Sequence, residues 1–259
     1  MAGLLEILRP PWESEMSKNF ELLRRAGRED VLFSRSSSDS VPNDNGHRRL
    51  DLGKQAQEEA LKLVQRVFVF PNSHAPRAVV FSSIQGNGST EICCRAGEVL
   101  AAQGSGSVCL VDANLHAPSL HQLLGVAKSP GLIDAIVKPG PIKDFTVRIA
   151  GGNLWLLPSG SAAEAQGLFA SDRLRSRVGE LREEFDYVLI DAPAVGCNAD
   201  AVVLGQMADG VVLVVEANST RRETARMAKE IFEGANVKLL GAILNNRTFP
   251  IPEALYRKL

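Results

Sequence analysis

Aromatic side chains are scarce in this 259-residue sequence, at 5% of the residues, and only two of them are tyrosines, Tyr187 and Tyr256. No apolar run approaches the roughly 20 residues that span a bilayer, so the sequence predicts no transmembrane helix. The first residues, MAGLLEILRPPWESE, lack a basic stretch followed by a long apolar one, which argues against a secretory signal peptide. These absences favour a cytoplasmic protein.

The number of cysteines and the net charge are also low. The formal net charge is -1, whereas nucleic-acid-binding proteins usually carry a basic excess, so no nucleic acid is expected as a partner. No two cysteines form a Cys-x-x-Cys pair, and we expect reduced, mostly buried thiols at Cys93, Cys94, Cys109 and Cys197.

The chain falls into two parts by composition. Residues 34–50, SRSSSDSVPNDNGHRRL, offer almost nothing to bury, so residues 1–50 are expected to form an N-terminal arm and a disordered linker. Residues 51–259 read as one folded domain, in which short apolar runs alternate with helical stretches. The expected strands are 78–81, 108–111, 154–157, 187–190, 211–215 and 239–244, and the clearest helices are 57–67, 90–103, 172–184 and 221–233. This alternation predicts an α/β fold with a mainly parallel central sheet and helices on both faces.

Polar residues gather directly after four of the expected strands, at the sheet edge where ligands bind to parallel sheets. They occupy positions 82–90, 112–114, 191–193 and 245–247. The segment Gly86-Asn87-Gly88-Ser89-Thr90 has the character of a phosphate-binding loop, because its glycines and the following helix turn backbone N–H groups toward an anion. The Thr90 hydroxyl and the Asp191 carboxylate are candidates for holding Mg²⁺, and Asp112 for orienting water or accepting a proton.

On these residues the chain resembles the cytoplasmic kinase domain of the bacterial tyrosine kinases of capsule and exopolysaccharide synthesis, which belong to the deviant-Walker P-loop ATPases. The resemblance runs from about residue 57 to residue 246, and is carried by the loop and helix 86–104, by VCLVDANLHAPSLHQLL (108–124) and by FDYVLIDAP (185–193).

The resemblance implies a P-loop NTPase-like fold with ATP and Mg²⁺ as cofactors. It implies Asp112 and Asp191 as catalytic residues, and Thr90, Asp112 and Asp191 as metal ligands. Nucleotide binding falls to Gly86, Asn87, Gly88, Ser89, Thr90 and Asn245, with Asn246 as the alternative for the asparagine that reads adenine.

The sequence departs from the family pattern at positions that carry charge. Ser89 stands where the family has the Walker A lysine, and serine offers no positive charge to the β- and γ-phosphates. Asn114 replaces the second aspartate of an Asp-x-Asp motif, and His116 replaces an arginine. Glu91 adds negative charge beside the loop, and Arg95, one turn further on, is placed to pair with it.

Two further departures from the family pattern concern the tyrosines that are phosphorylated and the motif that forms the oligomer. The family phosphorylates tyrosines clustered in a C-terminal tail, whereas Tyr256 stands alone there and Tyr187 falls in an expected core strand. The family's oligomerisation motif Glu-x-x-Arg-x-x-Arg reads here as Glu59, Lys62 and Gln65, and glutamine does not replace the guanidinium fork of arginine. The resemblance still implies a homo-oligomer, and an inner-membrane chain-length or export protein as the partner that recruits the chain to the inner membrane.

Together these features favour a degenerate, pseudokinase-like regulator of exopolysaccharide or capsule synthesis and export that keeps weak ATP and Mg²⁺ binding. The alternatives are an active ATP-dependent protein tyrosine autokinase and a partition-type spatial ATPase. The partition-type ATPases need a lysine in the same loop, so Ser89 counts equally against that alternative.

Overall fold

A computed structural model describes residues 54–69, 75–85, 88–104, 106–149, 151–160, 169, 171–196 and 199–246, all within one compact unit of the chain. The predictions for residues 1–50, Gly86, Asn87, Cys197 and Tyr256 lie outside these residues.

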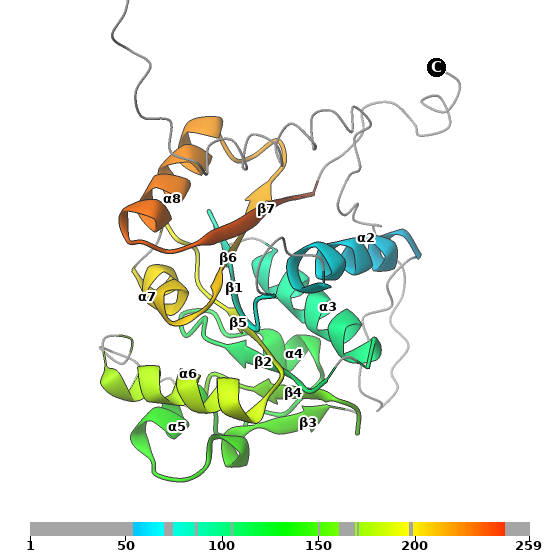
Figure 1. Cartoon of the computed structure of the whole chain (residues 1–259), viewed down its shortest axis with the longest axis vertical. Coiled ribbons are helices and arrows are strands. Elements are labelled where there is room, and N and C mark those ends of the chain that lie inside the picture. The colour runs from blue at the N-terminus through cyan, green and yellow to red at the C-terminus, as the bar shows by residue number, and fades with distance from the viewer. Residues whose placement is uncertain are drawn as a thin grey trace, which may run out of the picture. The chain divides into compact units, whose positions relative to one another are not determined.

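The described part of the chain forms one seven-stranded sheet with the strand order β3-β4-β2-β5-β1-β6-β7 (Figure 1). Neighbouring strands are parallel, apart from the antiparallel pair of β3 and β4 at one edge. The prediction of a mainly parallel sheet is therefore confirmed. The strands are β1 (Ala78–Ser83), β2 (Val108–Asp112), β3 (Val147–Ile149), β4 (Leu154–Leu157), β5 (Tyr187–Asp191), β6 (Gly210–Glu216) and β7 (Leu239–Asn245).

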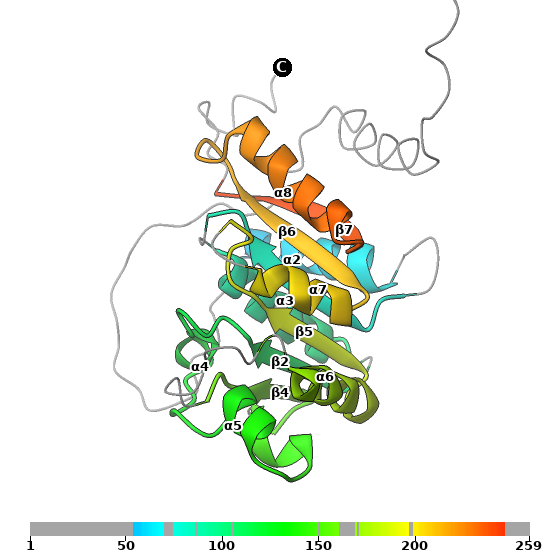
Figure 2. The same cartoon turned by 90° about the vertical axis from the view of Figure 1, so that its left-hand side faces the viewer.

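Helices cover both faces of the sheet, and each face has its own apolar core (Figures 1 and 2). One face packs against α2 (Lys54–Val64), α3 (Ser89–Ala102) and α4 (Leu120–Leu123). The other packs against α5 (Leu132–Val137), α6 (Asp172–Glu184), α7 (Asp200–Met207) and α8 (Arg222–Gly234). Every residue of β1 and β2 is buried, which explains why their sequences are continuous apolar runs rather than alternating ones.

Short one-turn segments complete the described elements. A π-helical turn, η1 (Gln65–Val69), continues α2, and a 3₁₀ turn, η2 (Ile142–Phe145), precedes β3. The buried thiols expected at Cys93, Cys94 and Cys109 are confirmed, and burial is the main reason that the pKa of each lies well above its ordinary value. Tyr187 begins β5 and packs edge-on against Phe68, with ring centroids 5.7 Å apart, as expected for a core strand.

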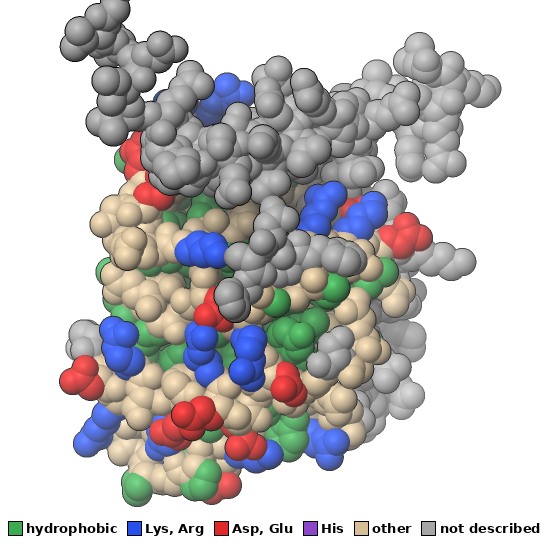
Figure 3. Space-filling model, in the orientation of Figure 1, with side chains coloured by type: hydrophobic (Ala, Val, Ile, Leu, Met, Phe, Trp, Pro, Cys, Tyr) green, Lys and Arg blue, Asp and Glu red, His purple; other side chains and the backbone are tan. Residues whose placement is uncertain are grey.

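The surface agrees with the near-zero net charge. On the face drawn in Figure 3, Lys and Arg side chains are interspersed with Asp and Glu, so the described residues form no continuous basic surface there. Among the residues with described positions, no helix combines the length and the apolar character that crossing a bilayer requires.

Candidate functional site

The expected phosphate-binding loop leads directly into α3. Gly88 caps that helix with a φ of 86°, a left-handed conformation that glycine adopts without steric cost. A Cβ at this position would also lie 2.1 Å from Nδ2 of Asn245, the last residue of β7. The side chain of Asn245 therefore rests on the loop, and only glycine leaves room for it there.

Thr90 and the two aspartates meet at the carboxyl end of the sheet, as the sequence predicts. Asp112 ends β2, Asp191 ends β5, and the two are register partners on adjacent parallel strands. The Thr90 hydroxyl, in the first turn of α3, donates a hydrogen bond of 2.7 Å to Oδ2 of Asp191. Both carboxylates are fully buried. The strand order thus brings together three residues that lie up to 101 positions apart in the sequence.

Burial sets the ionisation of these carboxylates. It raises the pKa of Asp112 to about 6, although the Leu120 N–H, which donates to the carboxylate, and the nearby backbone N–H groups of Asn114 and Ser119 act to lower it. Burial also raises the pKa of Asp191 well above its ordinary value; the hydrogen bond from Thr90 opposes this, and the charge of Asp112 adds to it. The site therefore holds two carboxylates whose negative charge is poorly compensated by the protein.

The remaining carboxylate oxygens suit a divalent cation. Oδ2 of Asp112 accepts from the Leu120 N–H at 3.1 Å, and Oδ2 of Asp191 accepts from Thr90. Oδ1 of each aspartate is buried without a hydrogen-bond partner. Two buried carboxylate oxygens and a nearby hydroxyl are the hard oxygen donors that Mg²⁺ prefers, so these residues fit the metal that the resemblance implies.

Hydrogen bonds between neighbouring strand ends hold the site in place. The Ser82 hydroxyl, at the end of β1, donates to the carbonyl of Pro193 at 2.7 Å. The Ala113 N–H donates to the carbonyl of Asp191 at 2.9 Å, and the Val195 N–H donates to that of Ser83 at 2.9 Å. The segment after β5 is thus joined to the end of β1, and the segment after β2 to the end of β5.

The departures from the family pattern lie beside the same site. Ser89 is the first residue of α3 and is buried, with 4% of its surface exposed. The expected ion pair of Glu91 with Arg95 forms, so the Arg95 guanidinium is engaged by a carboxylate of its own helix. His116 lies across from the start of α7, with Nε2 3.4 Å from Oδ2 of Asp200.

One polar residue of this edge escaped the sequence analysis. Glu216 ends β6, pairs in register with Asn245, and accepts a hydrogen bond of 3.1 Å from Nδ2 of Asn246 at Oε1. The signal was present, since Glu216 directly follows the expected strand 211–215 and breaks its apolar run.

Comparisons with known proteins identify the family of this chain. A family model described as ParA, NUBPL iron-transfer P-loop NTPase, matches residues 76–257. The chain is 31% identical over 170 residues to the tyrosine-protein kinase YwqD of Bacillus subtilis (strain 168), a match that covers 65% of this chain and 71% of that protein. It is 29% identical over 178 residues to the succinoglycan biosynthesis transport protein ExoP of Rhizobium meliloti (strain 1021).

The match covers 64% of this chain but only 22% of ExoP, so the chain spans about a fifth of that protein's length. Among solved structures, the crystal structure of the chimerical protein CapA2B2 superposes with a TM-score of 0.69 at 22% identity, covering 76% of this chain and 87% of that one. At that identity the superposition shows a common fold. The family match and the kinase relatives identify this chain as a member of the ParA-like P-loop NTPases, within the bacterial tyrosine kinases.

Proposed function

We propose that this chain is a degenerate kinase domain that binds MgATP weakly and regulates exopolysaccharide or capsule synthesis and export. One observation supports the proposal: Gly88, Thr90 and two buried aspartates lie at the carboxyl end of the sheet, while the buried Ser89 stands where the family has a lysine. The site keeps the means to hold a metal and lacks the positive charge that a lysine would place on the phosphates.

Each residue then has a defined task. Gly88 and the first turn of α3 present backbone N–H groups to phosphate oxygens, and Thr90, Asp112 and Asp191 hold the metal. Bound Mg²⁺ supplies positive charge to the phosphates. Asp112 also accepts from the Leu120 N–H, so it holds the segment after β2 in place whether or not the metal is bound.

The proposed setting is the cytoplasmic side of the inner membrane, where a polysaccharide chain-length or export protein recruits the chain. The name of the relative ExoP, a succinoglycan biosynthesis transport protein, supports a place in polysaccharide export. A homo-oligomer belongs to the same proposal. The pairing of Glu59 with Lys62 at 2.7 Å within α2 would, however, leave that glutamate engaged inside its own helix.

The decisive comparison measures ATP affinity and ATP turnover for the wild type and for Ser89→Lys. We expect weak binding and no turnover in the wild type, and tighter binding with measurable turnover in Ser89→Lys. Ser89→Met is the matched control, because methionine adds comparable bulk at this buried position without charge; thermal unfolding of all three reports whether each variant folds.

An active autokinase is the second candidate, and the intact arrangement of Thr90 with Asp191 favours it. ATP-dependent phosphate on Tyr256 in the wild type would establish that activity and refute the regulator. If the wild type does not bind ATP at millimolar concentration, the proposal loses its nucleotide-binding part. What remains is a regulator that acts only by binding the polysaccharide export protein.

A further inference from the structure

The ends of β6 and β7 hold three neighbouring polar residues, Glu216, Asn245 and Asn246, one of which lies against Gly88. Glu216 and Asn245 are register partners, so their side chains leave the sheet on the same face. That face is the one covered by α2 and α3, because Val214 of β6 and Ile243 of β7 both belong to the apolar core there. Asn245 reaches the loop at Gly88, which puts Glu216 one strand away from that contact.

Asn246 completes the group through an unusual backbone conformation. Its φ is 56°, a left-handed value that asparagine tolerates better than most residues. The bend directs its amide back to Glu216, with Nδ2 3.1 Å from Oε1. A carboxylate only accepts hydrogen bonds, so the NH₂ side of the Asn246 amide must face Glu216, and its carbonyl oxygen Oδ1 points elsewhere.

Glu216 and Asn246 therefore present acceptors. The carboxylate has Oε2 in addition to the oxygen that accepts from Asn246, and the orientation of the amide fixes Oδ1 as a further acceptor. Both residues are half-buried rather than sealed in the core. A site rich in acceptors favours a ligand edge with N–H donors and disfavours one that offers only a carbonyl oxygen.

We propose that Glu216, which also holds Asn246 in place, makes the site selective for purine nucleotides that carry an exocyclic amine. The inference rests on the proposed nucleotide binding and names the group that determines base specificity. The amine is the N6 group of adenine or the N2 group of guanine, and inosine has neither.

The test compares the affinities of MgATP, MgGTP and MgITP for the full chain by isothermal titration calorimetry. We expect ATP or GTP to bind about tenfold or more tightly than ITP, as loss of a hydrogen bond to a charged group predicts. Whichever of the two binds more tightly identifies the amine that is read. In Glu216→Gln the preference over ITP should fall to about threefold or less, because the single amide oxygen accepts from Asn246 and an NH₂ donor takes the place of the acceptor Oε2.

Glu223→Gln is the matched control, since it removes the same charge from an exposed position in the first turn of α8 and should leave the preference unchanged. Thermal unfolding checks that Glu216→Gln folds; its amide oxygen can still accept from Asn246. Equal affinity of the wild type for all three nucleotides, or an unchanged preference in Glu216→Gln, would overturn the inference while leaving nucleotide binding intact. Failure of every nucleotide to bind would overturn nucleotide binding and the inference together.

Discussion

The two ends of the central sheet hold pairs of aspartates in opposite electrostatic states. At the carboxyl end, burial raises the pKa of both Asp112 and Asp191. At the amino end, hydrogen bonds to backbone and side-chain donors lower the pKa of both Asp186 and Asp209, even though burial acts against this at Asp209. Aspartate carboxylates thus accept several hydrogen bonds at the amino end of the sheet and too few at the carboxyl end.

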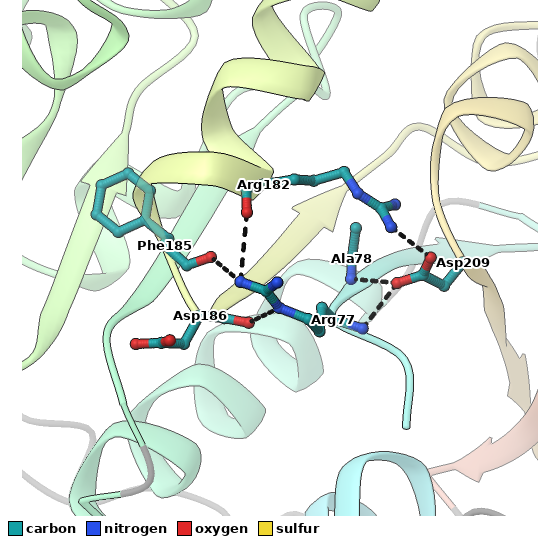
Figure 4. Close-up of polar contacts among 6 residues, drawn as sticks. All are labelled: Arg77, Ala78, Arg182, Phe185, Asp186 and Asp209. Carbon is teal, nitrogen blue, oxygen red and sulfur yellow. Dashed lines mark hydrogen bonds and ion pairs between the residues drawn. The ribbon is translucent and has the colours of Figure 1, made fainter. Parts of the chain in front are cut away.

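The amino end is a closed network (Figure 4). Oδ2 of Asp209 accepts from the backbone N–H groups of Arg77 and Ala78 at 2.7 and 2.8 Å, and Oδ1 accepts from the Arg182 guanidinium at 2.7 Å. The Arg77 guanidinium in turn donates to the backbone carbonyls of Arg182, Phe185 and Asp186. These contacts join the starts of β1, β5 and β6 to the end of α6.

The difference teaches which end serves stability and which serves binding. Satisfied carboxylates stabilise the fold in proportion to their hydrogen bonds, whereas buried and unpartnered carboxylate oxygens cost stability unless a ligand satisfies them. Ligands of parallel sheets bind at the carboxyl end, so the costly pair lies at the end of the sheet where ligand binding is expected.

Removal of Asp209 should give the largest loss of stability. In Asp209→Ala, two backbone N–H groups and Arg182 lose their acceptor, and we expect the free energy of unfolding to fall by about 3 kcal/mol. Asp209→Asn keeps an oxygen for the backbone donors and should lose only about 1 kcal/mol. Urea unfolding at pH 7 measures both, and equal losses in the two variants would show that the backbone contacts do not matter.

The carboxyl end should show a pH dependence of opposite sign. The pKa of Asp112 is raised from 3.8 to about 6 in the folded chain, so the folded state binds its proton more tightly than the unfolded state does. The contribution of Asp112 to stability is therefore complete below the unfolded pKa and is lost as the pH rises through about 6. The loss is on the order of 2–3 kcal/mol.

Unfolding of the wild type and Asp112→Asn between pH 3 and 8 isolates that contribution. The two curves should converge at low pH, and the variant should become the more stable one above pH 6. Ionisation of Asp186 and Asp209 acts the other way: their lowered pKa values give stability that is present at neutral pH and lost on acidification. A difference between the curves that does not change with pH would contradict the role of Asp112.

The loop glycine should be less tolerant than a helical glycine of the same fold. Gly88→Ala must accept a left-handed φ and displace Asn245, and we expect a loss of about 1–2 kcal/mol. At Gly179 in α6 a Cβ meets nothing within 4 Å, so Gly179→Ala should instead stabilise the chain by about 0.5–1 kcal/mol. Thermal unfolding compares them; a neutral Gly88→Ala would show that Asn245 does not depend on the loop.

The smallest effect is expected at Ser107, at the amino end. Its hydroxyl donates to Oδ2 of Asp186 at 2.9 Å, and its backbone N–H donates to the same oxygen at 2.8 Å. Ser107→Ala keeps the backbone contact, so the loss should be about 0.5–1 kcal/mol. The exposed Ser176→Ala in α6 is the control, and an equal effect there would remove the hydroxyl of Ser107 from the network.

The sequence predicted the long elements and the centre of the site because both depend on regular patterns. Apolar runs located six strands, and the parallel order brought Asp112 and Asp191 together at their ends. The three-residue β3 and the six-residue α5 are too short to show a period, so they went undetected. The contact of Asn246 with Glu216 depends on a left-handed backbone bend that no sequence pattern announces.

The most direct test of the account titrates the wild-type chain and Asp191→Asn with MgATP while the unfolding temperature is recorded. The carboxyl end is proposed to be unstable by itself and completed by the ligand, so MgATP should raise the unfolding temperature of the wild type in a concentration-dependent way. Asp191→Asn should unfold at a higher temperature than the wild type without ligand and should gain little from MgATP. An unligated Asp191→Asn that is no more stable than the wild type, together with an equal gain from MgATP in both, would contradict the account.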